Sequence, residues 1–329
     1  MKLEINKHSE NILRMAKEHP EIVVMSADLG SSCEIKEFSQ QYPERYLSMG
    51  IAEQNMCSWA AGLAREGFRP FIHTFSVFLY RRILDQLEMS VAYPNLPVVF
   101  VGFVPGITTP GGVTHQSTND IGVIRTVPNF AIFDIGDATE IESVLDIAYE
   151  YNGPVYIRML RKEVPRFFPA DKPMEFNKAR VLSEGDDVTI LSSSICTEEA
   201  MRATAALRKK GVSIQHLHVS TLKPFTDPQV VEACNKAKFG VVTIENGTVI
   251  GGLGTCVAEV MAENAIGQPL IKVGLQDAYA HGASKMYLLE HYHMDAMTLI
   301  KGVEKLMGQD LGIKAEDLEA IRYEDFSAV

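Results

Sequence analysis

The sequence has few cysteines, no excess of positive charge and no long apolar run. Its five cysteines are an odd number and form no CxxC pair, which favours reduced thiols over a disulfide framework or a zinc site. No apolar segment reaches the length that a membrane span needs, and the first residues lack the apolar core of a signal peptide. We therefore expect a cytoplasmic protein.

Acidic side chains outnumber basic ones by 42 to 31, which gives a formal net charge of −11. Such a surface repels phosphate backbones and no basic run offsets the repulsion, so nucleic acid is not an expected partner. The apolar share of 46% and the charged share of 22% are those of an ordinary globular protein. A length of 329 residues suits two domains, each able to bury its own core.

Short apolar strands alternate with amphipathic helical segments through both halves of the chain. This alternation predicts an α/β fold of two doubly wound domains with mostly parallel sheets. In the first half we expect strands at 22–27, 70–74, 97–101, 130–134 and 154–159, and helices at 8–18, 75–91, 120–126, 137–150 and from 53 onward. In the second half we expect strands at 188–193, 213–217, 240–244 and 271–273, and helices at 197–210, 227–237, 254–261 and 294–307.

Prolines and charged residues crowd the stretch from 161 to 185, which shows no apolar periodicity. That composition is typical of an interdomain linker. We therefore predict a first domain over 1–165, a linker over 166–185 and a second domain over 186–329.

The stretch SMGIAEQN, residues 48–55, places a carboxylate at the start of a predicted helix. The helical spacing of the apolar residues from Met56 onward puts Glu53 in the first turn, just after a glycine turn at Gly50. Taken alone, an acidic residue at this position need do no more than complement the helix dipole. Its interpretation depends on the motifs that follow.

Two such motifs are TFSVF at 74–78 and GVTHQ at 112–116. In this order and spacing, they and residues 48–55 resemble the pyrimidine-binding domain of thiamine diphosphate enzymes, the transketolase family in particular. The resemblance covers nearly the whole chain, but only the second and third domains of a full transketolase. It implies the carboxy-terminal subunit of a split, two-chain transketolase, which transfers a two-carbon ketol unit from a ketose to an aldose.

The resemblance assigns four residues to the cofactor. Glu53 would hydrogen-bond the ring nitrogen of the aminopyrimidine, which the cofactor needs in order to act as its own base. Phe78 and its neighbour Phe75, predicted on one face of the helix 75–91, would give the aminopyrimidine an aromatic platform. Asp28 would approach the thiazolium. Without the resemblance, the two phenylalanines read as core residues and Asp28 as a turn residue.

Three further residues would bind the substrate. His115 lies in a polar loop and can donate or accept a hydrogen bond near neutral pH. Arg161 falls where the family binds the anionic end of its substrate, and a guanidinium matches an oxyanion in shape. Ser32 matches a position near the substrate phosphate, although capping of a turn explains a serine there equally well.

The sequence shows no GDG…N segment, which in this family holds Mg²⁺ and the cofactor's diphosphate. We therefore expect a companion chain that supplies this segment and the Mg²⁺ site. The expected assembly is an α2β2 hetero-tetramer or a self-dimer, and this chain alone is not expected to turn over.

Three positions depart from the usual sugar-phosphate pattern of the family. Gly111 stands where transketolases carry an aspartate, Phe103 where they carry a histidine, and Asn6 near a phosphate-binding arginine. Loss of these polar groups makes the acceptor end more apolar or more open. The substrate is therefore expected to be an unusual ketose with an anionic group.

Other functions fit parts of the pattern. The β subunit of a 2-oxo acid dehydrogenase E1 component has the same two-domain plan and the same IAEQ stretch, but THQ at 114–116 and IRTVPN at 124–129 look like the transketolase form. A reaction like that of deoxyxylulose-phosphate synthase is a further variant, although that enzyme is normally one long chain. A noncatalytic paralogue that keeps the fold is the alternative from another class.

Overall fold

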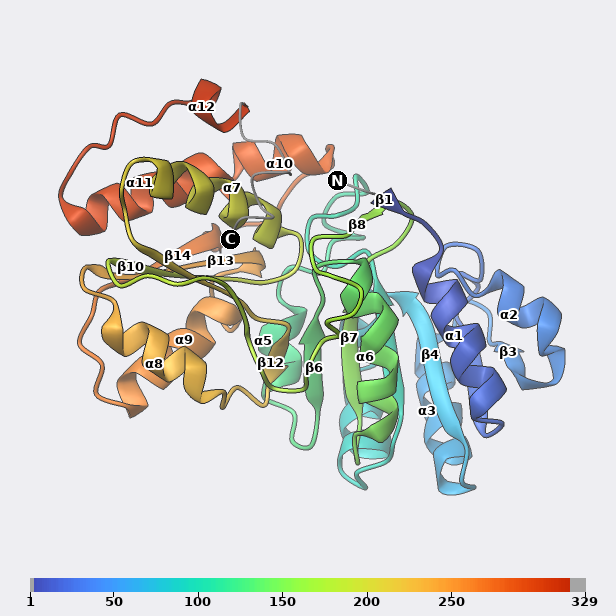
Figure 1. The fold of residues 1–329 in the computed structure, drawn as a ribbon. Helices are drawn as coiled ribbons and strands as arrows, with labels where there is room; N and C mark the ends of the chain where they lie inside the picture. The colour runs from blue at the N-terminus through green and yellow to red at the C-terminus, as the bar shows by residue number, and fades with distance from the viewer. Residues whose placement is uncertain (1–2, 320–329) are drawn as a thin grey trace.

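The computed structural model describes residues 3–319, so the last ten residues of the expected second domain lie outside it. Its two main sheets stand side by side (Figure 1). The larger has seven strands in the order β12-β6-β7-β5-β4-β2-β3, and the smaller has five in the order β14-β13-β10-β11-β9. All neighbouring strands run parallel except the edge strands β12 and β9. The predicted α/β fold with mostly parallel sheets is confirmed.

The first part of the chain builds most of the larger sheet and its helices. Its strands are β2 (Ile22–Ser26), β3 (Tyr46–Ser48), β4 (Arg69–Phe75), β5 (Val99–Phe103), β6 (Ala131–Asp134) and β7 (Val155–Met159). Its helices are α1 (Lys7–Glu18), α2 (Lys36–Gln41), α3 (Glu53–Arg65), α4 (Phe78–Arg81), α5 (Asp120–Arg125) and α6 (Ala138–Glu150), with a 3₁₀ turn η1 (Pro43–Arg45) and a π-helix η2 (Gln86–Ala92). A small antiparallel pair, β1 (Leu3–Glu4) with β8 (Val164–Pro165), closes this part.

The second part of the chain forms the smaller sheet. Its strands are β9 (Arg180–Ser183), β10 (Val188–Ser192), β11 (Ile214–His218), β13 (Gly240–Thr248) and β14 (Leu270–Leu275). Its helices are α7 (Cys196–Lys209), α8 (Pro228–Lys236), α9 (Leu253–Glu263), α10 (Lys285–His291), α11 (Ala296–Met307) and α12 (Ala315–Glu319).

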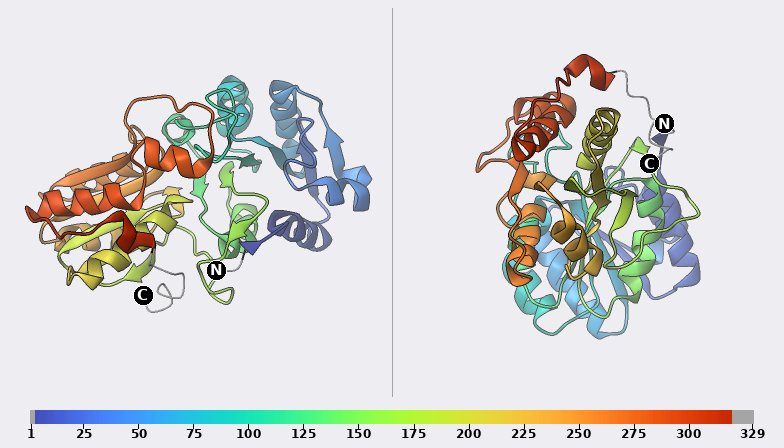
Figure 2. Two further views of the ribbon diagram at one scale, coloured as in Figure 1. Left: turned by 90° about the horizontal axis from the view of Figure 1, so that it is seen from above. Right: turned by 60° about the vertical axis from the view of Figure 1, so that its left-hand side comes forward.

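Helices cover both faces of each sheet, as Figures 1 and 2 show. Helices α1 and α6 pack on one face of the larger sheet and α3 on the other, while α7 and α11 lie opposite α8 and α9 on the smaller one. Because both faces are covered, the central strands are buried along their whole length and are mostly apolar. The loops after the carboxyl ends of the strands are thus left to carry the chemistry.

The predicted continuous helix over 75–91 is wrong. Phe75 ends β4, helix α4 covers only Phe78–Arg81, and after a turn the chain winds as the π-helix Gln86–Ala92. The buried residues Leu79, Ile83, Leu87 and Val91 are spaced four apart. On an α-helix of 3.6 residues per turn, residues four apart drift steadily around the surface and away from the core. The π-helix has more residues per turn, so Leu87 and Val91 still face the core.

The predicted linker is not irregular throughout. Residues 180–183 form β9, which pairs antiparallel with β11 at the edge of the smaller sheet. The side chains of Phe168, Met174 and Ala179 in the same stretch are buried. Prolines and charge therefore mark a segment that crosses between the sheets while packing on both.

One strand crosses back to the first sheet. Strand β12 (Thr221–Lys223) follows β11 in the second part of the chain but pairs antiparallel with β6 at the edge of the larger sheet. Leu222 is buried there, and the Lys223 ammonium donates to the carbonyl oxygen of Arg125 at 2.9 Å. The two parts of the chain therefore share one sheet.

A buried arginine holds the junction of the two parts. Arg158 in β7 donates to the carboxylates of Asp120 at 3.0 Å and Asp134 at 2.9 Å, and to the carbonyl oxygens of Ser117 at 3.1 Å and Asn246 at 2.8 Å. Burial opposes the charge of Arg158, but the two carboxylates raise its pKa above the ordinary value. Asn246 belongs to β13, so this ion cluster ties the second sheet to the first.

Candidate active site

The residues assigned from the sequence follow the carboxyl ends of parallel strands. Asp28 comes after β2, Phe75 ends β4 and Arg161 comes after β7, while Glu53 opens α3. These strand ends meet at one edge of the sheet, which is where open α/β sheets bind ligands. The structure brings Glu53, Phe75, His115 and Arg161 into one chain of contacts through Phe78, Arg82 and Ser32.

Glu53 is the first residue of α3 and is only 4% exposed. Gly50 just before it has a φ of 67°, which a glycine adopts without strain, and so the chain can turn sharply into the helix. The carboxylate accepts one hydrogen bond, at 2.6 Å, from Arg82 Nη1. The predicted helical start at Glu53 is confirmed, and the helix presents a nearly buried carboxylate at its amino end.

Three aromatic rings are linked to this carboxylate through Arg82, whose guanidinium lies over the Phe78 ring. The rings of Phe75 and Phe78 are close to parallel, 26° apart with centroids at 6.1 Å. The imidazole of His115 meets both edge-on, at 6.2 Å from Phe75 and 5.7 Å from Phe78. The two phenylalanines do lie together, although one ends a strand and the other begins a helix instead of both lining one helical face.

The loop that carries His115 is held from both parts of the chain. Arg81 donates to the carbonyl oxygens of Val113 at 2.8 Å and Gln116 at 3.3 Å. The Gln116 amide in turn donates to the carbonyl oxygen of His281 in the second part, at 3.3 Å. The hydroxyl of Thr114 lies 2.9 Å from His115 Nδ1. These contacts leave His115 half-buried with its ring beside the phenylalanines.

Arg161, which follows β7, contacts Phe75 at the end of β4 and Ser32 in the loop after β2. Its guanidinium carbon lies 5.1 Å from the centroid of the Phe75 ring, and Nη1 donates to the backbone carbonyl of Ser32 at 2.9 Å. Ser32 therefore meets Arg161 through its backbone and not through its hydroxyl. Asp28 is exposed in the preceding loop, with a φ of 61°.

Sequence reasoning missed Arg82. Its guanidinium carbon lies 3.9 Å from the centroid of the Phe78 ring while Nη1 bonds Glu53. Arg82 is four residues after Phe78, which is the spacing of neighbours on one helical face, and that spacing was the available signal.

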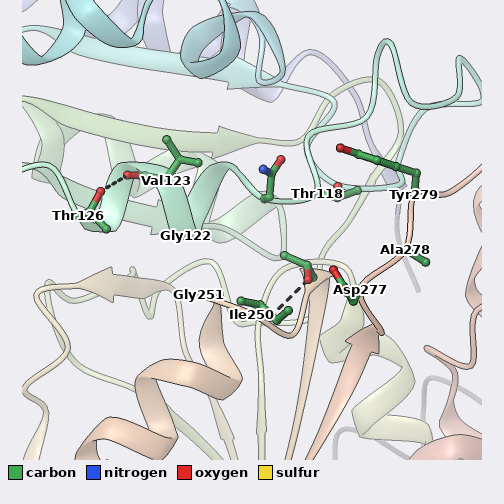
Figure 3. Close-up of a pocket in the computed structure, with 11 residues that line it drawn as sticks. Thr118, Gly122, Val123, Thr126, Ile250, Gly251, Asp277, Ala278 and Tyr279 are labelled. Atoms are coloured by element: carbon green, nitrogen blue, oxygen red, sulfur yellow. Dashed lines mark hydrogen bonds between the residues drawn. The ribbon is translucent and has the colours of Figure 1, made fainter.

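Two hollows in the surface differ in how they relate to these residues. One of about 220 Å³ is lined by Arg161 together with Lys162 and, from α10 in the second part of the chain, Lys285. The other, of about 600 Å³, lies between α5 and the loops after β13 and β14 and is lined by residues such as Gly122, Gly251 and Tyr279 (Figure 3). The larger hollow includes none of the residues assigned from the sequence.

Comparison with known proteins decides the family. Residues 5–166 match the family described as "Transketolase, pyrimidine binding domain", and residues 177–298 match the family described as "Transketolase, C-terminal domain". The chain belongs to the transketolase family. Its dependence on thiamine diphosphate follows from that membership.

Relatives of this transketolase-family chain include subunits of split enzymes. It is 38% identical over 296 residues to the 6-deoxy-6-sulfo-D-fructose transketolase subunit SqwH of Clostridium sp. (strain MSTE9), covering 90% of this chain and 91% of that one. It is 33% identical over 306 residues to the putative transketolase C-terminal section of Methanocaldococcus jannaschii, covering 92% and 96%. A solved structure described as "Split gene transketolase, inactive beta4 tetramer" matches with a TM-score of 0.85 and 36% identity over 92% of this chain and 97% of that chain.

The site of this transketolase-family chain suits one half of the cofactor. Glu53 has a nearly buried carboxylate, which could hydrogen-bond a ring nitrogen, and Arg82 links it to the half-buried ring of Phe78. Within residues 3–319, no group of three histidine, cysteine, aspartate or glutamate side chains is arranged to hold a metal ion. The same residues contain no helix long and apolar enough to cross a membrane.

The three departures from the family pattern have different structural settings. A Cβ at Gly111 would lie 2.9 Å from the Cβ of His115, so a larger residue there would have to displace His115 or its loop. Phe103 ends β5 fully buried, its ring meeting that of His8 edge-on at 5.2 Å. Asn6 is exposed and precedes α1. Phe103 thus belongs to the layer beneath the site.

That layer contains a buried pair of histidines, His8 and His73, whose Nε2 atoms lie 3.0 Å apart. Burial lowers the pKa of His73 to about 4 and that of His8 well below its ordinary value. Below pH 6.5 the two histidines bind protons in the unfolded chain but stay neutral in the folded chain. Stability is therefore present at neutral pH and is lost as the pH falls from about 6.5 towards 4.

We expect the free energy of unfolding to fall by roughly 2 kcal/mol per buried histidine between pH 7 and pH 5. Urea unfolding at the two pH values measures the loss, and His73→Phe should remove part of it. The exposed His293 provides the matched control, because His293→Asn should leave the pH dependence unchanged. Equal stability of the wild-type protein at both pH values would contradict the prediction.

Proposed function

We propose that this chain is the pyrimidine-binding subunit of a two-chain transketolase that transfers a two-carbon ketol unit from a ketose donor to an aldose acceptor. The observation that carries the proposal is the nearly buried carboxylate of Glu53, at the start of α3, which Arg82 links to the Phe78 ring and so to the aromatic cluster that includes His115. A carboxylate next to an aromatic face is what an aminopyrimidine needs from its protein.

In this proposal Glu53 hydrogen-bonds the pyrimidine nitrogen, and Phe78, supported by Phe75, stacks on the ring. Asp28 lies on the thiazolium side. When bound, thiamine diphosphate supplies the carbon nucleophile that attacks the ketose carbonyl. His115 hydrogen-bonds the hydroxyl or carbonyl oxygen of the substrate, since its ring borders the same cluster.

We propose that the donor carries an anionic group held by Arg161 and Ser32. Arg161 lines the hollow of about 220 Å³ beside Lys162, Lys285 and one acidic residue, Glu163, so cations outnumber carboxylates there and favour an anion. The relative from Clostridium is a subunit that acts on 6-deoxy-6-sulfo-D-fructose, so a sulfonate belongs among the candidates beside a phosphate.

We propose further that a companion chain holds Mg²⁺ and the diphosphate, in an α2β2 hetero-tetramer or a dimer built on this chain, in the cytoplasm. Two observations support a separate companion. The chain is similar to split-transketolase subunits along almost their full length, and the similar solved structure of a split-gene transketolase is described as an inactive β4 tetramer. A 2-oxo acid dehydrogenase subunit and a noncatalytic paralogue are outcomes that the test below distinguishes.

The test is a mixing experiment. This chain is assayed alone and with a coexpressed companion that carries a GDG…N segment, in the presence of thiamine diphosphate, Mg²⁺ and panels of phosphorylated ketoses, sulfonated ketoses and 2-oxo acids. Ketol transfer by the mixture alone supports the proposal. Decarboxylation of a 2-oxo acid would replace it with the dehydrogenase function, and a cofactor-binding complex with no activity would favour the noncatalytic paralogue.

His115→Ala should slow ketol transfer from every donor by about 10²-fold, because the substrate loses a positioned proton donor or acceptor. Steady-state kinetics of the assembled enzyme measures the loss, with thiamine diphosphate affinity measured in parallel. Thr114→Ala in the same loop is the matched control and should have a smaller effect, since the Thr114 hydroxyl contacts His115 only at Nδ1 and otherwise the carbonyl oxygen of Gly111. A change in cofactor affinity alone would place His115 outside the substrate site.

A further inference from the structure

One side chain makes both of the contacts that the aminopyrimidine is proposed to make. Arg82 donates from Nη1 to Glu53 Oε1 at 2.6 Å, and its guanidinium carbon lies 3.9 Å from the centroid of the Phe78 ring. A guanidinium is flat, carries N–H donors in its plane and stacks on aromatic faces. It thus resembles a protonated pyrimidine ring in shape and in hydrogen bonding.

We propose that Arg82 is a placeholder for the cofactor. In the free subunit its guanidinium covers Phe78 and neutralises Glu53, and it must leave when the aminopyrimidine enters. The inference rests on the proposed function and adds to it an internal competitor for the cofactor's site.

The surroundings of Arg82 permit it to leave at low cost. Its side chain is 44% exposed, whereas that of Glu53 is 5% exposed, so the arginine reaches in from solvent to a fixed carboxylate. Arg82 also follows the short helix α4, where the chain turns before the π-helix Gln86–Ala92. Water therefore reaches the guanidinium side of both the ion pair and the cation–π contact, and access of water weakens contacts of both kinds.

Arg158, another arginine that pairs with carboxylates, is held far more firmly than Arg82. Arg158 is fully buried and donates to two carboxylates and two carbonyl oxygens. The neighbouring Arg81 donates to Tyr80 and to the loop that carries His115. Within residues 3–319, Arg82 donates a hydrogen bond to Glu53 and to no other side chain, and it stacks on the ring of Phe78. It is therefore held by the two groups that the cofactor would take over.

The contact with Arg82 stabilises the Glu53 carboxylate in the free subunit. A nearly buried carboxylate with no partner is costly, since its charge loses most of its hydration. Arg82 supplies that partner until the cofactor arrives. The same contact lowers the apparent affinity for the cofactor, because the aminopyrimidine must first displace the guanidinium.

The test measures binding by the complex of this chain with its companion, using isothermal titration calorimetry. Arg82→Ala should bind thiamine diphosphate with Mg²⁺ about tenfold more tightly than wild type, since the two contacts to be broken together correspond to about that factor. Arg82→Gln should also bind thiamine diphosphate more tightly than wild type. The affinity of Arg82→Lys should lie between those of wild type and Arg82→Ala, because an ammonium keeps the charge but lacks the flat plane of the guanidinium. Arg65→Ala removes an exposed positive charge at the far end of α3 and should leave the affinity unchanged.

A second probe separates place-holding from simple charge attraction. Inorganic pyrophosphate with Mg²⁺ is an anion without a pyrimidine, so its affinity should be the same in wild type and Arg82→Ala. Unchanged or weaker thiamine diphosphate binding by Arg82→Ala, with wild type binding normally, would overturn the placeholder and make Arg82 a support for the cofactor. Failure of every assembled complex to bind thiamine diphosphate would instead overturn the proposed function, and this inference with it.

Discussion

Glu53→Gln is expected to reduce ketol transfer by the assembled enzyme by about 10³-fold or more, since proton transfer through a positioned carboxyl contributes factors of this order. The amide keeps the shape of the side chain, but it cannot exchange a proton with the pyrimidine nitrogen. Glu53 is 4% exposed, so little water can take over this role. Initial rates of ketol transfer, at saturating thiamine diphosphate and Mg²⁺, measure the effect.

The matched control lies on the same helix. Glu66 follows the last turn of α3 and is exposed, and Glu66→Gln should leave the rate unchanged. Glu53→Gln should still fold and still assemble with the companion, as gel filtration and circular dichroism can show. Turnover by Glu53→Gln at the wild-type rate would remove Glu53 from the catalytic site.

Arg158→Met is expected to lower the free energy of unfolding by about 3–5 kcal/mol, the typical cost of breaking a buried ion pair by removing one partner. Asp120 and Asp134 would remain buried without a cation. Burial already raises the pKa of Asp134, and the charge of Arg158 opposes that rise. Urea unfolding at pH 7 measures the loss.

A charge-neutral triple variant tests the mechanism behind this loss. Adding Asp120→Asn and Asp134→Asn to Arg158→Met removes the uncompensated charges, so stability should partly return. Arg14 pairs at the surface with Glu18 and Asp146 and is the matched control, because Arg14→Met should cost about 1 kcal/mol or less. A loss at Arg158 as small as that at Arg14 would show that the buried cluster does not stabilise the fold.

The fold could be predicted from the sequence wherever buried strands and amphipathic helices are long. Strands β2, β5 and β7 and helices α1 and α6 lie close to their expected positions, because apolar periodicity follows burial directly. Strand β3 has three residues and lies at the edge of its sheet, so it shows no such periodicity. Strand β12 is defined by a partner nearly ninety residues away, which local sequence does not reveal.

The candidate site was predictable to the extent that it follows strand ends. Glu53 and His115 could be assigned from motifs that follow such ends; His115 lies beside Phe78, and Glu53 is joined to Phe78 through Arg82. The spacing from Phe78 was too weak a signal to assign Arg82, because on the predicted helix over 75–91 Arg81 lies three residues after Phe78 and is an equally close neighbour. The break between α4 and the π-helix, which depends on tertiary packing, separates the contacts of Arg81 from those of Arg82.

Strand β12 also constrains the order in which the protein can fold during synthesis. The edge of the larger sheet beside β6 stays open until residues 221–223 have left the ribosome, long after β7 has been made. Open strand edges invite pairing with other chains. Until then the nascent first half exposes an incomplete sheet, so we expect chains released early, before residue 221, to aggregate more readily than chains released after residue 223.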